Sequence, residues 1–390
     1  MNVYYQIDAE KKILIGELTE IDSSIDEISL GSPSTPEGIE EYLNILSVGK
    51  LSPLPKGYEN LCKVIGANNE SSLLSVPRHK LTSHFRNTLE QLRIVFCEPD
   101  NIDYLVTYVS IRKFLYGLCR AYVDNQSLFE HIDDTDNPTV KSSLKSLQSQ
   151  EGNLADPVMY SMSSTSTGRL VVNSGPRILT MPAQARECFS SRFEEGKVLQ
   201  IDVISAEPKF ALYVAGEKIP YDVYEYVSQH ILNGDVTRND AKLITLCALY
   251  GQSLKKLQNK LPDSVSARTV VRKTREYFKH DLLVSKLKSE YAVGKLRSAV
   301  GRPLPVESDN SHMLISHYLQ SSVAESAILM FADFIDKEAG RCVPLFVIHD
   351  ALIVDCDKET SKRLLGEKTV ELLLGDWKFD ANISLVGNSY

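Results

Sequence analysis

The pattern of apolar and polar positions predicts a hairpin and then helices in the first third of the chain. Residues 1–20 alternate around a polar A-E-K-K segment, which is typical of two short strands joined by a turn. Residues 78–98 and 101–124 have the pattern of two helices, and a shorter helix is expected before the polar loop at 133–138.

Apolar runs in the second half predict strands that carry acidic residues. The run at 198–204 is interrupted only by Gln200 and Asp202, and a later pair of runs flanks His349 and Asp350 as a hairpin with a carboxylate at its tip. A carboxylate buried in a strand is costly unless it is paired or binds a metal ion. Taken alone, Asp350 is a typical turn residue. Together with Asp202 it supplies the two carboxylates that a two-metal site needs.

A helical pattern over residues 238–251 places four side chains on one slanting stripe. Arg238, Lys242, Leu246 and Tyr250 stand four residues apart, so each step drifts by only about 40° around the helix. Two cations lie near the helix start, where backbone amides also attract anions, and an apolar and an aromatic group follow. This order suits a nucleoside triphosphate lying along the helix. An ordinary amphipathic helix with a buried tyrosine has the same pattern.

The charge distribution changes the picture more than the composition does. The chain has 390 residues, 43% of them apolar, which is ordinary for a globular protein of two or three subdomains. Its net charge is -8, yet residues 255–302 hold thirteen Lys or Arg against four acids. Within this segment Arg268, Arg272, Arg275 and Lys279 recur at helical spacing, as expected of a face that follows a nucleic-acid backbone. A solvated basic face is the alternative.

Cysteine usage and hydropathy exclude several classes of protein. The seven cysteines are odd in number, widely spread and never in a C-x-x-C pair, so neither a zinc site nor a disulfide framework is indicated. No run of about eighteen apolar residues and no signal or transit sequence is evident. We therefore expect no membrane partner and a cytoplasmic location, which is the host cytoplasm if the chain is phage-encoded.

Six short motifs follow one another in the second half of the chain. They are T-G-R-L at 167–170, D-x4-E within 199–207, R-x3-K-x7-Y-G at 238–251, G-R-P-L-P at 301–305, a glutamine-bearing helix around Gln320, and His-Asp between the apolar runs at 346–354. In this order they resemble the A-family DNA polymerases, the relatives of bacterial DNA polymerase I. The resemblance covers roughly residues 155–390. It implies an α+β, right-hand polymerase fold with an antiparallel palm sheet, helical fingers and a reduced helical thumb.

The resemblance also implies subdomain limits. These are a reduced thumb at 76–155, a palm at 156–215 and 310–390, and fingers at 216–309, after a small N-terminal element of unknown role at 1–75. Asp8 and Glu10 form a D-x-E like that of proofreading exonucleases, but we expect them in the turn of the hairpin. Neither a proofreading nor a 5′-nuclease domain is expected.

By resemblance, the expected chemistry is phosphoryl transfer at a two-metal site. Asp202 and Asp350 are the implied catalytic carboxylates. With the backbone carbonyl of Val203 they would hold two Mg²⁺ ions, for which Mn²⁺ is a substitute. The implied activity is template-directed addition of dNTPs to a primer 3′-hydroxyl, without intrinsic proofreading.

The remaining implied roles concern the nucleotide and the primer–template DNA. Arg238 and Lys242 would bind the phosphates, and Glu207, held by Tyr250, would close against the sugar 2′ position and so favour dNTPs. The other implied nucleotide-binding residues are Leu246 and His349. The implied DNA-binding residues are Arg169 at the primer terminus, Gln320 in the minor groove, and the basic residues Arg268, Arg272, Arg275 and Lys279. For a lone arginine such as Arg169, a surface ion pair is the alternative.

The sequence departs from the family pattern at several positions, including the V-I-S-A segment after Asp202 and Pro208 after Glu207. Ala351 stands where the His-Asp motif usually continues with glutamate, Leu246 where an aromatic residue is usual, and Ser316 where asparagine is usual. Two alternatives stay open: a degenerate relative that binds primer–template DNA without efficient synthesis, and an RNA-synthesising or primase-like polymerase. The two aspartates weigh against the first alternative, and Glu207 weighs against the second.

Overall fold

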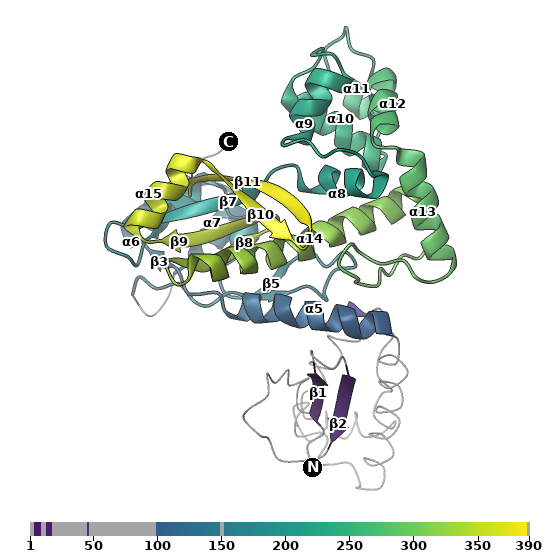
Figure 1. Ribbon diagram of the computed structural model, residues 1–390. Coiled ribbons are helices and arrows are strands. Elements are labelled where there is room, and N and C mark those ends of the chain that lie inside the picture. The colour runs from purple at the N-terminus through teal and green to yellow at the C-terminus, as the bar shows by residue number, and fades with distance from the viewer. Residues whose placement is uncertain (1–3, 9–12, 18–44, 47–98, 149–151, 388–390) are drawn as a thin grey trace, which may run out of the picture. The chain divides into compact units, whose positions relative to one another are not determined.

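The structure, a computed structural model, describes residues 4–8, 13–17, 45–46, 99–148 and 152–387 (Figure 1). The chain divides into two compact units, one of residues 1–110 with 300–305 and one of residues 111–299 with 306–390. All the site residues expected from the sequence lie in the second unit. The helix expected at 78–98 and the acid Glu10 lie outside the described residues.

The first unit contains a β-hairpin and most of a long helix. Strand β1 (Tyr4–Asp8) pairs antiparallel with β2 (Ile13–Glu17), so the predicted hairpin is confirmed. Asp8 was expected in the turn, but it ends β1 and pairs with Ile13. Helix α5 (Pro99–Tyr116) begins in this unit, where Tyr104 and Tyr108 are buried with their ring centroids 6.2 Å apart.

The second unit is organised around a five-stranded antiparallel sheet with the order β10-β11-β7-β9-β8. Its strands are β7 (Lys197–Val203), β8 (Cys342–Ile348), β9 (Ala351–Cys356), β10 (Thr369–Leu374) and β11 (Trp377–Leu385). The strand predicted at 198–204 and the hairpin predicted around His349 and Asp350 are therefore both present.

The register of the sheet separates an apolar face from a face that becomes polar at one end. Paired residues on neighbouring strands point to the same side. Ile201 pairs with Leu352 and Ile383, all of them buried, on the apolar face. Asp202 pairs with Ala351 and with Asn382 on the other face. A strand in the middle of the sheet thus carries an acid where the apolar packing ends.

A hydrophobic cluster covers the far end of that second face. Phe346 and Ile353 belong to this cluster together with Ile178 and Phe189, and the rings of Phe189 and Phe346 lie 5.2 Å apart between centroids. The covering elements are β3 (Tyr122–Val123), α6 (Asn125–Asp134), α7 (Pro138–Lys145), β4 (Met159–Ser161), β5 (Val171–Ser174), η2 (Ile178–Thr180), η3 (Gln184–Cys188) and β6 (Phe189–Ser190). Burial of this cluster stabilises the sheet and leaves its polar end accessible.

Two expectations in this region are wrong. The helix predicted at 101–124 stops at Tyr116, because Tyr122 and Val123 pair with β6 instead of continuing the helix. The hydroxyl-rich sequence M-Y-S-M-S-S-T-S-T at 159–167 predicts an extended segment before Arg169, but only Met159–Ser161 forms a strand and turns follow. Serine and threonine hydroxyls that bond locally compete with a regular backbone: Thr165 donates from Oγ1 to the Arg169 carbonyl at 3.0 Å.

Helices complete the second unit (Figure 1). They are α8 (Ala206–Ala215), α9 (Val223–Tyr226), the π-helical turn η4 (Val227–Ile231), α10 (Arg238–Tyr250), α11 (Leu254–Gln258), α12 (Ala267–Tyr277), α13 (His280–Ala292), α14 (Ser311–Glu338) and α15 (Lys358–Glu367). Helix α10 packs against α9, α12 and α14, and α14 also packs against α8 and β10. Within the described ranges, no helix is both long enough and apolar enough to cross a membrane.

The helix predicted at 238–251 is confirmed with defined ends. Thr237 caps α10 through a reciprocal pair of bonds with Asp240, which satisfies backbone amides at the helix start. Gly251 ends the helix with a φ of 69°, and the His312 ring occupies the space that a Cβ on Gly251 would need. This close approach fixes the C-terminal end of α10 against the start of α14.

Candidate active site

Asp202 and Asp350 are brought side by side by the pairing of β7 with β9. Asp202 pairs with Ala351, the residue after Asp350, and the Val203 amide donates to the Asp350 carbonyl at 3.1 Å. Asp350 follows His349, which has a φ of 56° in the tight turn between β8 and β9. The two acids, 148 positions apart in sequence, therefore meet at the polar end of the sheet.

The placement of the two acids shifts the pKa of each carboxyl group. Burial, and then the charge of Asp350, raise the pKa of Asp202 to about 7. The charges of Lys242, Arg186 and Arg238 act in the opposite direction on this pKa. Burial also raises the pKa of Asp350, whereas His349, Lys242 and Arg169 lower it. The positive charges near the pair therefore do not compensate fully for the desolvation of the two acids or for the effect of the Asp350 charge on Asp202.

The cationic start of α10 faces this pair of acids and is held by Asp222. Arg238 donates from Nε to Asp222 at 2.7 Å, and its side chain is 42% exposed. Lys242 is exposed one turn further along α10, and its charge reaches both Asp202 and Asp350. The stripe predicted on this helix is thus directed toward the acids, with its first cation engaged in an ion pair.

Glu207, Tyr250 and Arg169 form a second group beside the acids. Arg169 donates to Glu207 at 2.9 Å, which is the ion pair that was the alternative interpretation of this arginine. Burial, followed by the charge of Glu207 and hydrogen bonding to it, raises the pKa of Tyr250. In the described part of the chain, the Tyr250 hydroxyl makes no hydrogen bond of ordinary geometry. Glu207 is therefore near the hydroxyl, but the contact is loose.

The other expected site residues occupy less informative positions. Leu246 is partly buried between Lys242 and Tyr250 on α10, His349 is exposed in the β8–β9 turn, and Gln320 is partly buried on α14. The Val203 side chain is buried at the end of β7. The roles expected for these residues stay predictions.

The four basic residues expected on one helical face do not share a face. Arg268 and Arg272 are exposed on α12, but Arg275 donates inward to the Ala248 carbonyl at 3.0 Å. Lys279 lies beyond the end of α12, as the residue preceding α13, with a φ of 44°. The helical spacing fails because α12 ends at Tyr277, so the expectation of one continuous face is wrong.

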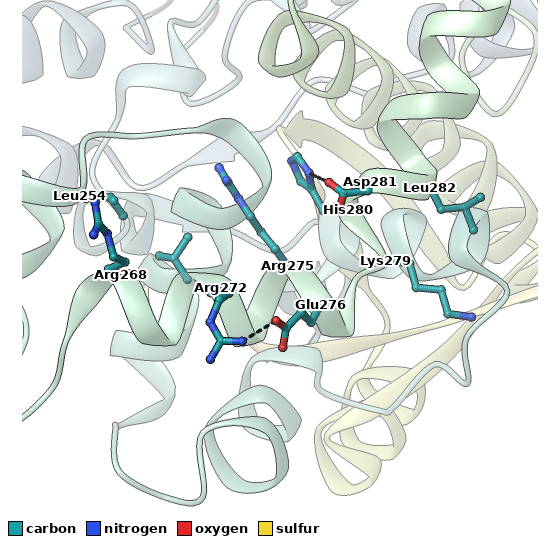
Figure 2. Close-up of a pocket in the computed structure, with 10 residues that line it drawn as sticks. Leu254, Arg268, Arg272, Arg275, Glu276, Lys279, His280, Asp281 and Leu282 are labelled. Carbon is teal, nitrogen blue, oxygen red and sulfur yellow. Dashed lines mark hydrogen bonds and ion pairs between the residues drawn. The ribbon is translucent and has the colours of Figure 1, made fainter.

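The same residues nevertheless line one cavity of about 590 Å³ (Figure 2). The four basic side chains point in different directions around it, and Arg272 is paired with Glu276 at 2.6 Å. His280 is 7% exposed, and its Nε2 has no partner among the described residues. Burial and the charge of Arg275 lower the pKa of His280. The cavity is lined by basic side chains, but these side chains do not converge on one point where they would enclose an anion.

Three residues of the site were missed by reasoning from the sequence. Arg186 on η3 donates to Gln200 at 3.2 Å and to the Met181 carbonyl at 3.1 Å, which holds its guanidinium near Asp202. Asp222 and Tyr224 begin α9, and both cations of α10 lie over the Tyr224 ring. A capping aspartate before V-Y-E was a readable signal for the start of a helix, but nothing in the sequence pointed to Arg186.

The residues present fit a pair of divalent metal ions. No group of three or more His, Cys, Asp or Glu side chains suited to a metal occurs within the described residues. A pair of carboxylates with a nearby backbone carbonyl is instead the sparse oxygen set that Mg²⁺ uses when substrate phosphates and water complete its shell. The raised pKa of Asp202 supports this fit, because a dication would favour the ionised form of both acids.

The fold is similar to that of a DNA polymerase domain. The chain is similar to the structure of the POL domain of Pol1 from M. smegmatis in complex with DNA primer-template and dNTP, with a TM-score of 0.56 and 13% sequence identity. The match covers 84% of this chain and 76% of the other. No family model matches the sequence, and no curated protein matches it. The resemblance to A-family polymerases drawn from the motifs is therefore confirmed at the level of the fold.

Proposed function

We propose that the chain is a template-directed DNA polymerase that adds dNTPs to a primer 3′-hydroxyl and lacks intrinsic proofreading. The observation that carries the proposal is the meeting of Asp202 and Asp350 opposite the cations of α10. Acids next to cations on a polymerase-like fold favour phosphoryl transfer, because one group can hold metal ions while the other binds phosphates. We propose the subdomain limits given above for the palm, fingers and thumb.

Each group in the site has a task in this reaction. Asp202 and Asp350, with the Val203 carbonyl, would hold two Mg²⁺ ions, which activate the attacking hydroxyl and stabilise the leaving group when bound. Arg238 and Lys242 bind the triphosphate and offset the charge that develops on the departing pyrophosphate. Arg238 is exposed enough to exchange its bond with Asp222 for a phosphate oxygen.

Glu207 and Tyr250 provide the proposed selection of deoxyribose. The Glu207 carboxylate is held by its ion pair with Arg169 and lies near the Tyr250 hydroxyl, so the ion pair is what restrains it. A restrained carboxylate beside the sugar excludes a 2′-hydroxyl by contact and leaves a 2′-hydrogen unhindered. A ribonucleotide would have to displace Glu207 and break its ion pair with Arg169.

The DNA contacts that we propose surround this centre. Arg169 and Gln320 would contact the primer–template duplex near the primer end, where base edges and sugars face the minor groove. The basic cavity on α12 and α13 would bind backbone phosphates of the DNA, because guanidinium and ammonium groups bind phosphate largely without regard to sequence. Arg268, which is exposed, is one proposed phosphate ligand there, and Lys279 would exchange its ion pair with Glu217 for a phosphate oxygen.

A primer-extension assay tests the proposal. The wild-type protein and its Asp202→Asn variant are incubated with a labelled primer–template and Mg²⁺, with either dNTPs or rNTPs. We expect templated extension with dNTPs by the wild type, a loss of about 10³-fold or more in the variant, and little extension with rNTPs. Asp136→Asn, at an exposed acid between α6 and α7, is the matched control and should retain full activity.

The alternatives give different results in the same assay. A protein that binds the primer–template but extends it with neither substrate would be a degenerate relative. Extension with rNTPs as efficient as with dNTPs would identify an RNA-synthesising enzyme and refute the role of Glu207. Equal activity of wild type and Asp202→Asn would remove the carboxylate pair from the mechanism.

A further inference from the structure

Tyr224 lies where the functional groups of the site converge. Its side chain is buried, with 7% of the residue exposed, near the start of α9. The Arg238 guanidinium lies 5.6 Å and the Lys242 ammonium 5.8 Å from the centroid of its ring. Both distances are within the range of about 6 Å over which a cation is attracted to an aromatic ring. One ring therefore contacts both cations of the α10 stripe.

The charges of nearby acids act on the Tyr224 hydroxyl. Burial, and then the charges of Glu207, Asp350 and Asp222, raise the pKa of this phenol. The Tyr224 hydroxyl therefore stays protonated in neutral and moderately basic solution. The ring adds no competing negative charge to the cations that it supports.

Asp222 fixes the position of Tyr224 relative to α10. Its carboxylate accepts from the Tyr224 amide at 2.9 Å and from the Ser205 hydroxyl at 3.1 Å, in addition to Arg238. Ser205 lies just beyond Asp202 and Val203 in the chain, and it has a φ of 52°. The capping bond thus ties α9, the end of β7 and the first cation of α10 together.

We propose that the aromatic ring of Tyr224 is a positioning element that presents Arg238 and Lys242 to the triphosphate of the incoming nucleotide. The inference rests on the proposed polymerase function and adds a residue to it. A long lysine or arginine side chain loses conformational freedom when it binds a phosphate. A ring that already holds both side chains reduces this loss and keeps their charges directed toward the acids. The ring is the acting part, and the hydroxyl is dispensable.

Direct nucleotide binding tests the proposal without requiring turnover. A primer ending in a dideoxynucleotide is annealed to a template, and the Kd of the matching dNTP for the protein–DNA complex is measured by titration with Mg²⁺ present. Tyr224→Phe keeps the ring, and we expect its Kd to stay within about twofold of wild type. Tyr224→Leu keeps an apolar side chain but no ring. Loss of two cation–ring contacts should raise its Kd about 5- to 30-fold.

Two further readouts separate positioning from a general structural role. Binding of the matching dNMP does not depend on the β- and γ-phosphates, so its Kd should be equal in Tyr224→Leu and wild type. Tyr226→Leu removes an aromatic residue from the same helix whose ring stacks on Tyr277, away from the two cations. This matched control should bind dNTP like the wild type.

Several results would overturn the proposal. Tyr224→Phe binding dNTP as weakly as Tyr224→Leu would assign the effect to the hydroxyl. An unchanged Kd in Tyr224→Leu, or an equal loss for dNTP and dNMP, would show that the ring does not act through the cations. A wild-type complex that binds dNTP but does not extend a normal primer would contradict the proposed function alone. A wild-type complex that does not bind dNTP would contradict both.

Discussion

Replacing Asp202 with asparagine should stabilise the metal-free protein while it removes the proposed activity. The reason is the pKa of Asp202, which burial and the charge of Asp350 raise to about 7. An unfolded chain releases this proton near pH 4. Between these two pH values the folded protein binds more protons than the unfolded chain does, so its stability falls as the pH rises toward 7 and levels off above it. Asparagine has no charge to bury and avoids this loss.

The magnitude follows from the distance between the two pKa values. Each pH unit corresponds to about 1.4 kcal/mol, so a difference of about three units gives roughly 4 kcal/mol at pH 8. Asp202 is partly exposed, and solvent screening reduces this figure, so we expect a gain of about 2–4 kcal/mol for Asp202→Asn above pH 7. Near pH 4 the variant and the wild type should differ by less than about 1 kcal/mol.

Urea unfolding in the presence of a chelator measures this difference. The single tryptophan, Trp377, is a suitable probe, because it lies on β11 with its ring stacked 4.8 Å from that of Tyr213. Unfolding curves at pH 4, 6 and 8 give the free energy of unfolding of each protein. Added Mg²⁺ should stabilise the wild type much more than the variant, because a ligand stabilises the state that binds it. Asp136→Asn is again the control.

The reasoning would be refuted by a variant that is no more stable than the wild type at pH 8 without metal. A gap that stays constant from pH 4 to pH 8 would also contradict it, because the gain would not then come from the titration of Asp202. If Mg²⁺ stabilised both proteins equally, Asp202 would not be a ligand of the metal ions.

Three other substitutions test neighbouring parts of the site. Glu207→Ala should reduce discrimination against rNTPs by about 5- to 150-fold in single-nucleotide insertion kinetics, because it removes a steric contact that costs a ribonucleotide about 1–3 kcal/mol. Unchanged sugar selectivity would show that Glu207 does not exclude the 2′-hydroxyl. Ala351→Glu adds a third carboxylate beside Asp202, so the Mg²⁺ concentration that gives half-maximal activity should fall. An unchanged concentration would place the new acid outside the metal site. Gly251→Ala places a methyl group against the His312 ring at a φ of 69°, so it should lower the free energy of unfolding by about 2 kcal/mol or more. An unchanged free energy of unfolding would show that the start of α14 can shift to accommodate the methyl group.

Local patterns were sufficient to predict the elements that carry the chemistry. The apolar runs around Asp202 and Asp350 correctly predicted β7 and the β8–β9 hairpin. A short apolar run that contains few polar residues or ends at a turn can be recognised as a strand from a few neighbouring residues. The four-residue spacing of α10 likewise gave a helix with its cations at the start. Spacing was misleading for Lys279, since periodicity does not show where one helix ends and another begins.

Long-range pairing decided which of these elements meet. The strand register set Asp202 beside Ala351 and Asn382, and folding then brought Arg186 toward Asp202 and Tyr224 beneath the cations of α10. Neither contact has a signature in neighbouring residues, because each joins side chains from separate elements through packing and hydrogen bonds to unrelated segments. Types of residue and their local conformation can be read along the chain, whereas the charge environment that sets a pKa exists only after the chain has folded.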